Sequence, residues 1–266
     1  MVVKKKNLSV IMGIYNCETT LVAAVQSIQE QSYTNWELII CDDGSSDNTY
    51  KIAEKLALQD DRIILIRNKN NRGLSFALNR CLNISSGKYI ARMDGDDLCV
   101  PDRFEKQVEL LDSCPNIAIV SSWMTLFDDD GDWGVLKVPE YPSPAEVVTG
   151  NPIPHAPSMM RREAIKKVHG YTVDKRVIRV EDVDLWIRLY AEGYRCHNIL
   201  EPLYKMRNDQ NALYRRKYKY RVYSTRVRLF GCKILHLSVA DYFKAFRPMV
   251  NGQFPARIRL FLRSKL

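Results

Sequence analysis

Short apolar runs alternate with helix-like stretches through the first hundred residues, and this alternation constrains the fold more than any other feature of the chain. Between the first two runs, Leu21, Ala24, Val25 and Ile28 recur at helical spacing. Alternating strands and helices form parallel sheets with right-handed connections. The pattern therefore predicts an α/β fold with parallel strands over residues 8–14, 38–41, 63–66 and 89–93.

Three carboxylates follow the fourth predicted strand within four residues, at Asp94, Asp96 and Asp97. Such side chains repel one another unless a cation lies between them, and hard oxygen ligands favour magnesium or manganese over zinc. Ligands of open α/β sheets bind beyond the carboxyl ends of the strands. The motif therefore predicts a cation-assisted site, and the alternative is a solvated acidic turn that caps the helix after Pro101.

Two other loops supply polar groups at predicted strand ends. Asp42 and Asp43 form a sharp turn with Gly44 after the second strand. Arg72 and Gly73 directly precede a helix predicted over residues 74–82, so a cation and a helix N-terminus would both face an anion. A solvated loop arginine is the alternative for Arg72.

The second half of the chain has a less regular pattern. It predicts a helix over residues 103–111, a strand over 117–120, and a hairpin turn at the acidic GDWG segment of residues 131–134 rather than a calcium loop. Residues 151–171 contain two prolines before His155 and then a short basic helix. We interpret this segment as a shaped loop and not as a core strand.

Glu181 and Asp182 begin a predicted helix whose apolar face includes Val183, Trp186 and Ile187. Carboxylates in a first helical turn complement the helix dipole, which is a sufficient structural reason for their presence. The functional alternative is a general base aimed at a substrate.

Positive charge is concentrated at the C-terminal end of the chain. Residues 205–266 contain 16 Lys or Arg against two Asp, a net +14, whereas residues 1–204 carry a net −5. Residues 214–228 and 254–262 interleave aromatic and basic residues, as expected for amphipathic helices at a headgroup interface. The alternatives are helices that pack on the rest of the protein and a module that binds nucleic acid.

The seven cysteines form no CxxC pair, and several lie in apolar runs, so we expect them to be reduced in a cytosolic compartment. The N-terminus lacks a secretory cleavage pattern. No stretch approaches the roughly 20 apolar residues of a membrane span. Any membrane contact is therefore expected to be peripheral.

Five motifs in order make the chain resemble family 2 glycosyltransferases: YN at 15–16, DDGSSDNT at 42–49, NRG at 71–73, RMDGDD at 92–97 and EDVDLWIRL at 181–189. The resemblance covers roughly residues 7–207. It implies the GT-A fold, a Rossmann-like and mostly parallel sheet with helices on both faces. The expected organisation is a catalytic domain over 1–205, with a nucleotide-sugar half to about residue 100 and an acceptor half beyond it, and a basic helical extension over 206–266.

The resemblance also implies roles for individual residues. Asp182 matches the catalytic base, with Glu181 beside it, and Asp96 and Asp94 match the ligands of Mn²⁺ or Mg²⁺. Acceptor-side candidates are His155, Trp186 and Asp97. The expected donor-binding residues are Tyr15, Asn16, Asp42, Asp43, Arg72, Arg92, Asp94 and Asp96. The sequence departs from the family pattern at Gly13-Ile14, where a proline is commoner, and at Gly95, where alanine is frequent.

An inverting transferase is thus expected, which moves a sugar from a nucleotide-diphosphate donor, UDP in our prediction, to a lipid-linked or oligosaccharide acceptor. The setting implied is bacterial O-antigen, capsule or exopolysaccharide synthesis at the cytoplasmic face of an anionic membrane, without nucleic acid. Two rivals are a sugar-nucleotide nucleotidyltransferase and a non-enzymatic nucleic-acid-binding module. The first typically has a glycine-rich phosphate loop near its start, where residues 8–16 contain only Gly13.

Overall fold

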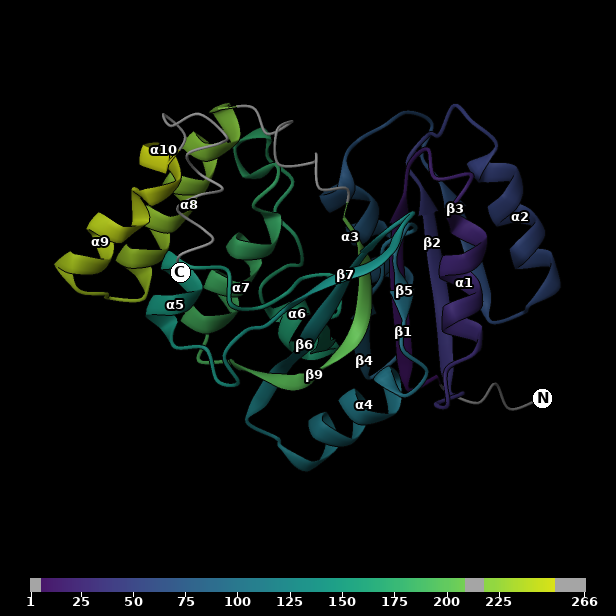
Figure 1. Cartoon of the computed structure of the whole chain (residues 1–266), viewed down its shortest axis with the longest axis horizontal. Helices are drawn as coiled ribbons and strands as arrows, with labels where there is room; N and C mark the ends of the chain where they lie inside the picture. Colours follow the sequence, from purple (N-terminus) through teal and green to yellow (C-terminus); the bar gives the residue numbers. More distant parts are fainter. Residues whose placement is uncertain (1–5, 209–217, 252–266) are drawn as a thin grey trace.

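The predicted alternation of strands and helices is present in the computed structural model, which describes residues 6–208 and 218–251 (Figure 1). The strands are β1 (Leu8–Ile14), β2 (Trp36–Asp42), β3 (Ile63–Arg67), β4 (Tyr89–Arg92), β5 (Leu98–Cys99), β6 (Ile117–Asp128), β7 (Gly131–Leu136), β8 (Met159–Arg161) and β9 (Arg195–Arg207). The helices are α1 (Leu21–Gln29), α2 (Thr49–Gln59), α3 (Leu74–Ile84), α4 (Arg103–Ser113), α5 (Pro144–Thr149), α6 (Arg162–Lys167), a 3₁₀ turn (Lys175–Val177), α7 (Glu181–Ala191), α8 (Tyr218–Ile234), α9 (Val239–Ala245) and α10 (Arg247–Asn251).

All strands join one sheet in the order β3-β2-β1-β4-β8-β6-β9-β5, with β7 paired to β6. The first four strands pair in parallel, as predicted, so their carboxyl ends share one edge. Beyond β4 the sheet is mixed, because β8 runs antiparallel to both β4 and β6 while β9 is parallel to β6. The sheet thus has a parallel half, whose strands end at or are followed by the motifs at residues 15–16, 42–49, 71–73 and 92–97, and a mixed half that continues it.

Side chains of β1 alternate between two hydrophobic cores, one on each face of the sheet. Val10 and Met12 belong to the core that contains residues of α1, α2 and α4. Ile11 belongs to the core on the other face, which contains residues of α3 and of α5 to α9. Burial on both faces explains why β1 and β2 are almost continuously apolar, and it confirms the predicted α/β fold with helices on both faces.

Two elements of the mixed half differ from the prediction. The strand expected over 117–120 extends to Asp128 and forms a hairpin with β7, with the acidic residues Asp129 and Asp130 at the turn. The segment 151–171, predicted to contain no core strand, includes β8, whose Met159 and Met160 are fully buried. A strand of three residues is too short to show a hydrophobic period, and β8 is stabilised by its pairing with β4 and β6.

The helices after β9 differ from those predicted for the basic tail. The helix expected over 214–228 corresponds to α8, which continues to Ile234. The second helix, expected over 254–262, lies outside the described residues. The sequence did not predict α9 and α10. Val227 and Cys232 of α8 belong to the same core as α5 and α7. Within residues 6–208 and 218–251, none of the helices has the length and hydropathy needed to cross a bilayer.

Gly231 allows α8 to approach α7 closely. A Cβ at this position would lie 2.6 Å from Cδ1 of Ile187 and 2.9 Å from Cγ2 of Val148. The contact shows that one face of α8 packs on the rest of the protein.

Candidate active site

A hollow of about 360 Å³ lies where the loops after β1 and β4 meet the end of β9. Tyr15, Asn16, Asp94 and Asp96, all predicted site residues, line it together with Arg207. We call it the acidic hollow. Its position beyond the carboxyl ends of two parallel strands is where α/β sheets bind ligands.

Gly95 brings these two loops together. A Cβ there would lie 2.9 Å from Cγ2 of Ile14 and 3.1 Å from Sγ of Cys17. Thr20 adds a hydrogen bond from its hydroxyl to the Gly95 carbonyl (2.9 Å). The narrow turn predicted for Gly95 is therefore a place of close approach to the β1 loop.

Tyr15 and Asn16 have different surroundings in the β1 loop. Tyr15 is 49% exposed, so its ring is available to a ligand. Asn16 adopts a left-handed conformation (φ 51°), and its Oδ1 accepts a hydrogen bond from the Ser46 backbone N–H at 3.0 Å. Asn16 thus joins the β1 loop to the loop after β2, and its side chain is engaged within the protein.

Asp94, Asp96 and Asp97 present carboxylate oxygens within 4.8 Å of one another. Both oxygens of Asp94 accept hydrogen bonds from Arg92, at 2.7 and 2.5 Å. Asp97 is 2% exposed and accepts a hydrogen bond from the Arg207 backbone N–H at 2.7 Å, whereas Asp96 is exposed. The sequence motif therefore places three carboxylates in three distinct environments, with Asp96 the most accessible.

The acidic cluster fits a divalent cation. Loss of hydration and the negative charge of Asp94 raise the pKa of Asp96, and burial together with the charges of Asp94 and Asp96 raises the pKa of Asp97. A bound cation relieves this repulsion. Asp96 and Asp94 line the hollow and would hold the ion, whereas the buried Asp97 supports the loop through Arg207.

Arg92 lies beneath this cluster instead of in the hollow. It is 4% exposed, and the negative charge of Asp94 helps to keep its guanidinium protonated. The positive charge of Arg92 also acts on the carboxylates of Glu181 and Asp182. Burial argues against the direct donor contact expected for Arg92, and its geometry is that of a residue that positions Asp94.

The two aspartates at the end of β2, Asp42 within the strand and Asp43 directly after it, are buried and already bonded. Asp42 pairs with Arg67 (2.9 Å) and accepts from the Ser45 N–H. Asp43 accepts hydrogen bonds from the backbone N–H groups of Arg72 and Gly73 (2.7 Å for Gly73) and from Nδ2 of Asn68 (2.6 Å). Asp43 thus fixes the loop before α3, and the structure leaves its predicted base contact untested.

Arg72 lines a second hollow, of about 210 Å³, and not the acidic hollow. Its guanidinium lies over the ring of Phe76, 4.2 Å from the ring centroid. Arg67, Lys69 and Arg80 line the same space. Arg72, the cation predicted to face an anion, therefore lies in a separate basic hollow.

Glu181 and Asp182 occupy the first turn of α7, as predicted. Burial is the main cause that raises the pKa of each carboxyl, and the charge of Asp182 adds to the rise for Glu181. The Val183 backbone N–H, which donates to Asp182 Oδ1 at 2.8 Å, and the cations Arg92 and Arg228 oppose the rise for Asp182. Such a carboxylate is partly desolvated, so its pKa is raised, while its hydrogen bond and the nearby cations limit the rise, which suits a general base.

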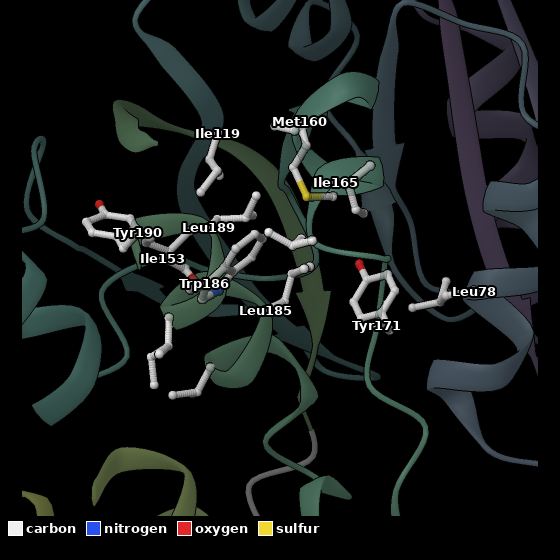
Figure 2. Packing of buried hydrophobic residues seen from close by; sticks show 14 of the residues in the cluster. Leu78, Ile119, Ile153, Met160, Ile165, Tyr171, Leu185, Trp186, Leu189 and Tyr190 are labelled. Carbon is white, nitrogen blue, oxygen red and sulfur yellow. The ribbon is translucent and has the colours of Figure 1, made fainter. Parts of the chain in front are cut away.

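The acceptor-side candidates His155 and Trp186 are in contact but differ in accessibility. Their rings meet edge to face with centroids 5.8 Å apart. Trp186 is 1% exposed, donates from its indole N–H to the Ile153 carbonyl (3.2 Å), and lies among the buried side chains of Figure 2. A side chain so deeply buried has no surface to offer an acceptor. Trp186, like Asp97, therefore contributes to the site through contacts within the protein.

His155 is only partly buried, and its Nε2 lies 2.8 Å from the hydroxyl of Tyr171. Burial and the nearby charge of Arg92 lower the pKa of His155 well below its usual value, so the ring is neutral at pH 7. It is the one of the three acceptor-side candidates that retains an accessible surface.

Sequence reasoning missed several residues of the site. Arg207 lines the acidic hollow, and the hydroxyl of Tyr204 accepts from the Asp94 backbone N–H (3.2 Å); both belong to β9. Arg228 of α8 donates to the Val148 carbonyl and is 8% exposed. More than 100 residues separate Tyr204 and Arg207 from the acidic motif, and no local pattern predicts such a contact.

Comparisons with known proteins agree with these features. The sequence model of the family "Glycosyl transferase family 2" matches residues 9–181. EpsE of Bacillus subtilis (strain 168), named as a glycosyltransferase, is 43% identical over 94% of this chain and 90% of its own. Also similar is the Escherichia coli UDP-Glc:alpha-D-GlcNAc-diphosphoundecaprenol beta-1,3-glucosyltransferase WfaP, 27% identical over 94% of this chain and 96% of its own.

The fold matches a solved glycosyltransferase structure as well. The mannosyltransferase PcManGT from Pyrobaculum calidifontis, in complex with GDP-Man and Mn²⁺, superposes with a TM-score of 0.66 at 16% identity, over 99% of this chain and 80% of that one. The predicted GT-A architecture is confirmed. The chain belongs to glycosyl transferase family 2 and is a glycosyltransferase.

Proposed function

We propose that the protein is a metal-dependent, inverting glycosyltransferase that moves a sugar from a UDP-sugar to a hydroxyl of a lipid-linked saccharide in bacterial surface-polysaccharide synthesis. The observation that carries the proposal is the linkage of two carboxylate sites through Arg92. Arg92 grips Asp94 in the acidic hollow, and its charge also acts on Glu181 and Asp182. The proposed donor site and the proposed base thus both lie within the electrostatic influence of one buried cation.

The acidic hollow would hold the donor. Asp96 and Asp94 would bind Mn²⁺ or Mg²⁺, which when bound stabilises the negative charge that develops on the departing diphosphate. The exposed ring of Tyr15 offers a stacking surface for the base. Support for a UDP-sugar and a lipid-linked acceptor comes from the printed name of WfaP, and support for the metal from the Mn²⁺ complex of PcManGT.

Asp182 would act as the general base on the acceptor. Its carboxylate takes the proton of the acceptor hydroxyl as that oxygen forms a bond to the anomeric carbon. The bond from this carbon to the diphosphate oxygen breaks, and its electron pair leaves with UDP. Because the two bonds lie on opposite faces of the sugar, the configuration inverts. Glu181 lies beside Asp182, and burial together with the charge of Asp182 raises the pKa of Glu181.

The test is a panel of UDP- and GDP-sugars with a diphospholipid-linked monosaccharide as acceptor, in Mn²⁺, Mg²⁺ or EDTA. We expect product only with a UDP-sugar and a divalent ion, and inverted configuration by NMR. Transfer that is undiminished in EDTA would refute the metal role, and a retained configuration would refute Asp182 as the base of a single displacement. Incorporation of the nucleotide itself would instead favour the nucleotidyltransferase alternative.

A further inference from the structure

Four large apolar residues form an exposed stripe along α9 and α10: Val239, Phe243, Phe246 and Val250. Their spacing of four, three and four residues places them on one side of a helical path. Val239 and Phe243 are 74% and 76% exposed, and Phe246 and Val250 are 43% and 53% exposed. We call these residues the outer stripe.

The outer stripe is not needed to hold α9 in place, because the opposite side of the helix does so. Ala245 is fully buried, and Tyr242 packs against the core that contains α5 and α7. Asp241, also buried, accepts from the Ser238 hydroxyl (2.6 Å) and pairs with Lys244 (2.9 Å). The helix therefore has a packed face and a second, apolar face in contact with solvent.

Basic residues accompany the outer stripe. Residues 218–251 contain seven Lys or Arg and a single acidic residue, Asp241. Arg226, Lys233 and Arg247 are exposed, and so is Phe230, which lies between the first two on one face of α8. Exposed apolar side chains within a stretch of net positive charge are typical of helices that lie at a lipid interface.

We propose that the outer stripe, together with Phe230 and the cations around it, docks the enzyme on the surface of an anionic lipid bilayer. Charge complementarity favours this partner, since each Lys or Arg near an anionic headgroup layer is attracted to it while the aromatic rings enter the acyl boundary. α9 and α10 form the end of the molecule opposite α2 (Figure 1), so docking leaves the nucleotide side in solution. The contact is superficial, in keeping with the lack of a bilayer-crossing helix among the described residues.

Docking at α9 and α10 would also place the acceptor side at the membrane. α8 contacts both α9 and α7, and α7 carries Asp182. This consequence rests on the proposed function, because only a lipid-linked acceptor makes such placement useful. The docking itself does not depend on it.

The experiment is co-sedimentation of the full-length protein with vesicles of phosphatidylcholine that contain rising fractions of phosphatidylglycerol. We expect binding to rise with the anionic fraction and fall with salt. Phe243→Ser combined with Val250→Ser should lower the partition coefficient at least about tenfold, since two apolar groups leave the interface. Leu58→Ser is the matched control, because Leu58 of α2 is 84% exposed at the other end of the molecule.

Several outcomes separate the alternatives. Wild-type protein that stays in solution at every composition, or a Phe243→Ser/Val250→Ser variant that binds like wild type, would overturn the proposal. Self-association of the wild type that this variant abolishes, without vesicle binding, would assign the outer stripe to a second copy instead. The variant should transfer sugar to a water-soluble acceptor at the wild-type rate. Wild-type protein that binds vesicles but transfers no sugar would refute the proposed function and leave the docking intact.

Discussion

The acidic hollow and the turn that bears Glu181 and Asp182 are both built on carboxylates, but they are assembled differently. In the hollow, Asp94 and Asp96 come from one short stretch at the end of β4, and Arg92 of the same stretch holds Asp94 from beneath. At α7, the base candidate Asp182 depends on partners from distant elements, Arg92 of β4 and Arg228 of α8. The difference shows that the carboxylates of the acidic hollow come from one local motif, whereas the environment of Asp182 is a product of the tertiary packing.

The largest effect is expected from Asp96→Asn, which removes the most accessible carboxylate of the hollow. Transfer should fall about a thousandfold or more, because the developing diphosphate charge loses its cation. Titration calorimetry with UDP and Mn²⁺ should show loss of metal-dependent affinity. Asp130→Asn, at the exposed β6–β7 turn, is the control and should bind like wild type.

Asp182→Asn should slow turnover by about a hundredfold or more, the usual contribution of a general base. Because its carboxylate lies on α7, whereas the proposed metal ligands Asp94 and Asp96 lie in the loop after β4, affinity for UDP and Mn²⁺ should stay nearly constant. Steady-state and single-turnover rates provide the measurement. A parallel collapse of donor affinity would make Asp182 a structural helix-terminal residue.

Substitutions of Arg92 would test the link between the two regions. Arg92→Lys keeps the charge but loses the two-point grip on Asp94, so we expect about tenfold weaker metal-dependent binding. Arg92→Met removes the charge as well, which raises the pKa of Asp182 further. Since Asp182 acts only when ionised, the acid limb of the kcat–pH profile should move to higher pH in Arg92→Met and not in Arg92→Lys. Identical acid limbs of the kcat–pH profile in both variants would show that the charge of Arg92 does not influence the ionisation of Asp182.

The smallest effect is expected from Gly231→Ala, which would push α8 away from α7. The added methyl group would meet Ile187 and Val148, at a cost of about 1–3 kcal/mol that exceeds the gain of up to about 1 kcal/mol in helix propensity. Denaturant unfolding should show a net loss, partly restored by adding Ile187→Val. A net gain in stability would contradict the close packing of α8.

For this same reason, the sequence predicts the meeting of residues in the acidic hollow better than it predicts the surroundings of Asp182. Tyr15, Asp94 and Asp96 follow strands that are predicted to pair in parallel, and the carboxyl ends of parallel strands lie at one edge of a sheet. Their meeting in the acidic hollow therefore follows from the predicted parallel sheet. The contribution of Arg207 needed the position of β9, and that of Arg228 needed α8 packed on α5, neither of which a local pattern encodes. Trp186 lies on the apolar face that the helical spacing predicts for it, and its burial there is in keeping with a place in the core.

The central claim is that one carboxylate site binds the donor and another activates the acceptor. The most direct measurement compares the affinity for UDP with Mn²⁺ and the single-turnover rate in Asp96→Asn and Asp182→Asn. We predict that Asp96→Asn lowers both the affinity for UDP with Mn²⁺ and the single-turnover rate. Asp182→Asn should keep the affinity and lower the rate. Equal losses of affinity in both variants would contradict the division into two sites.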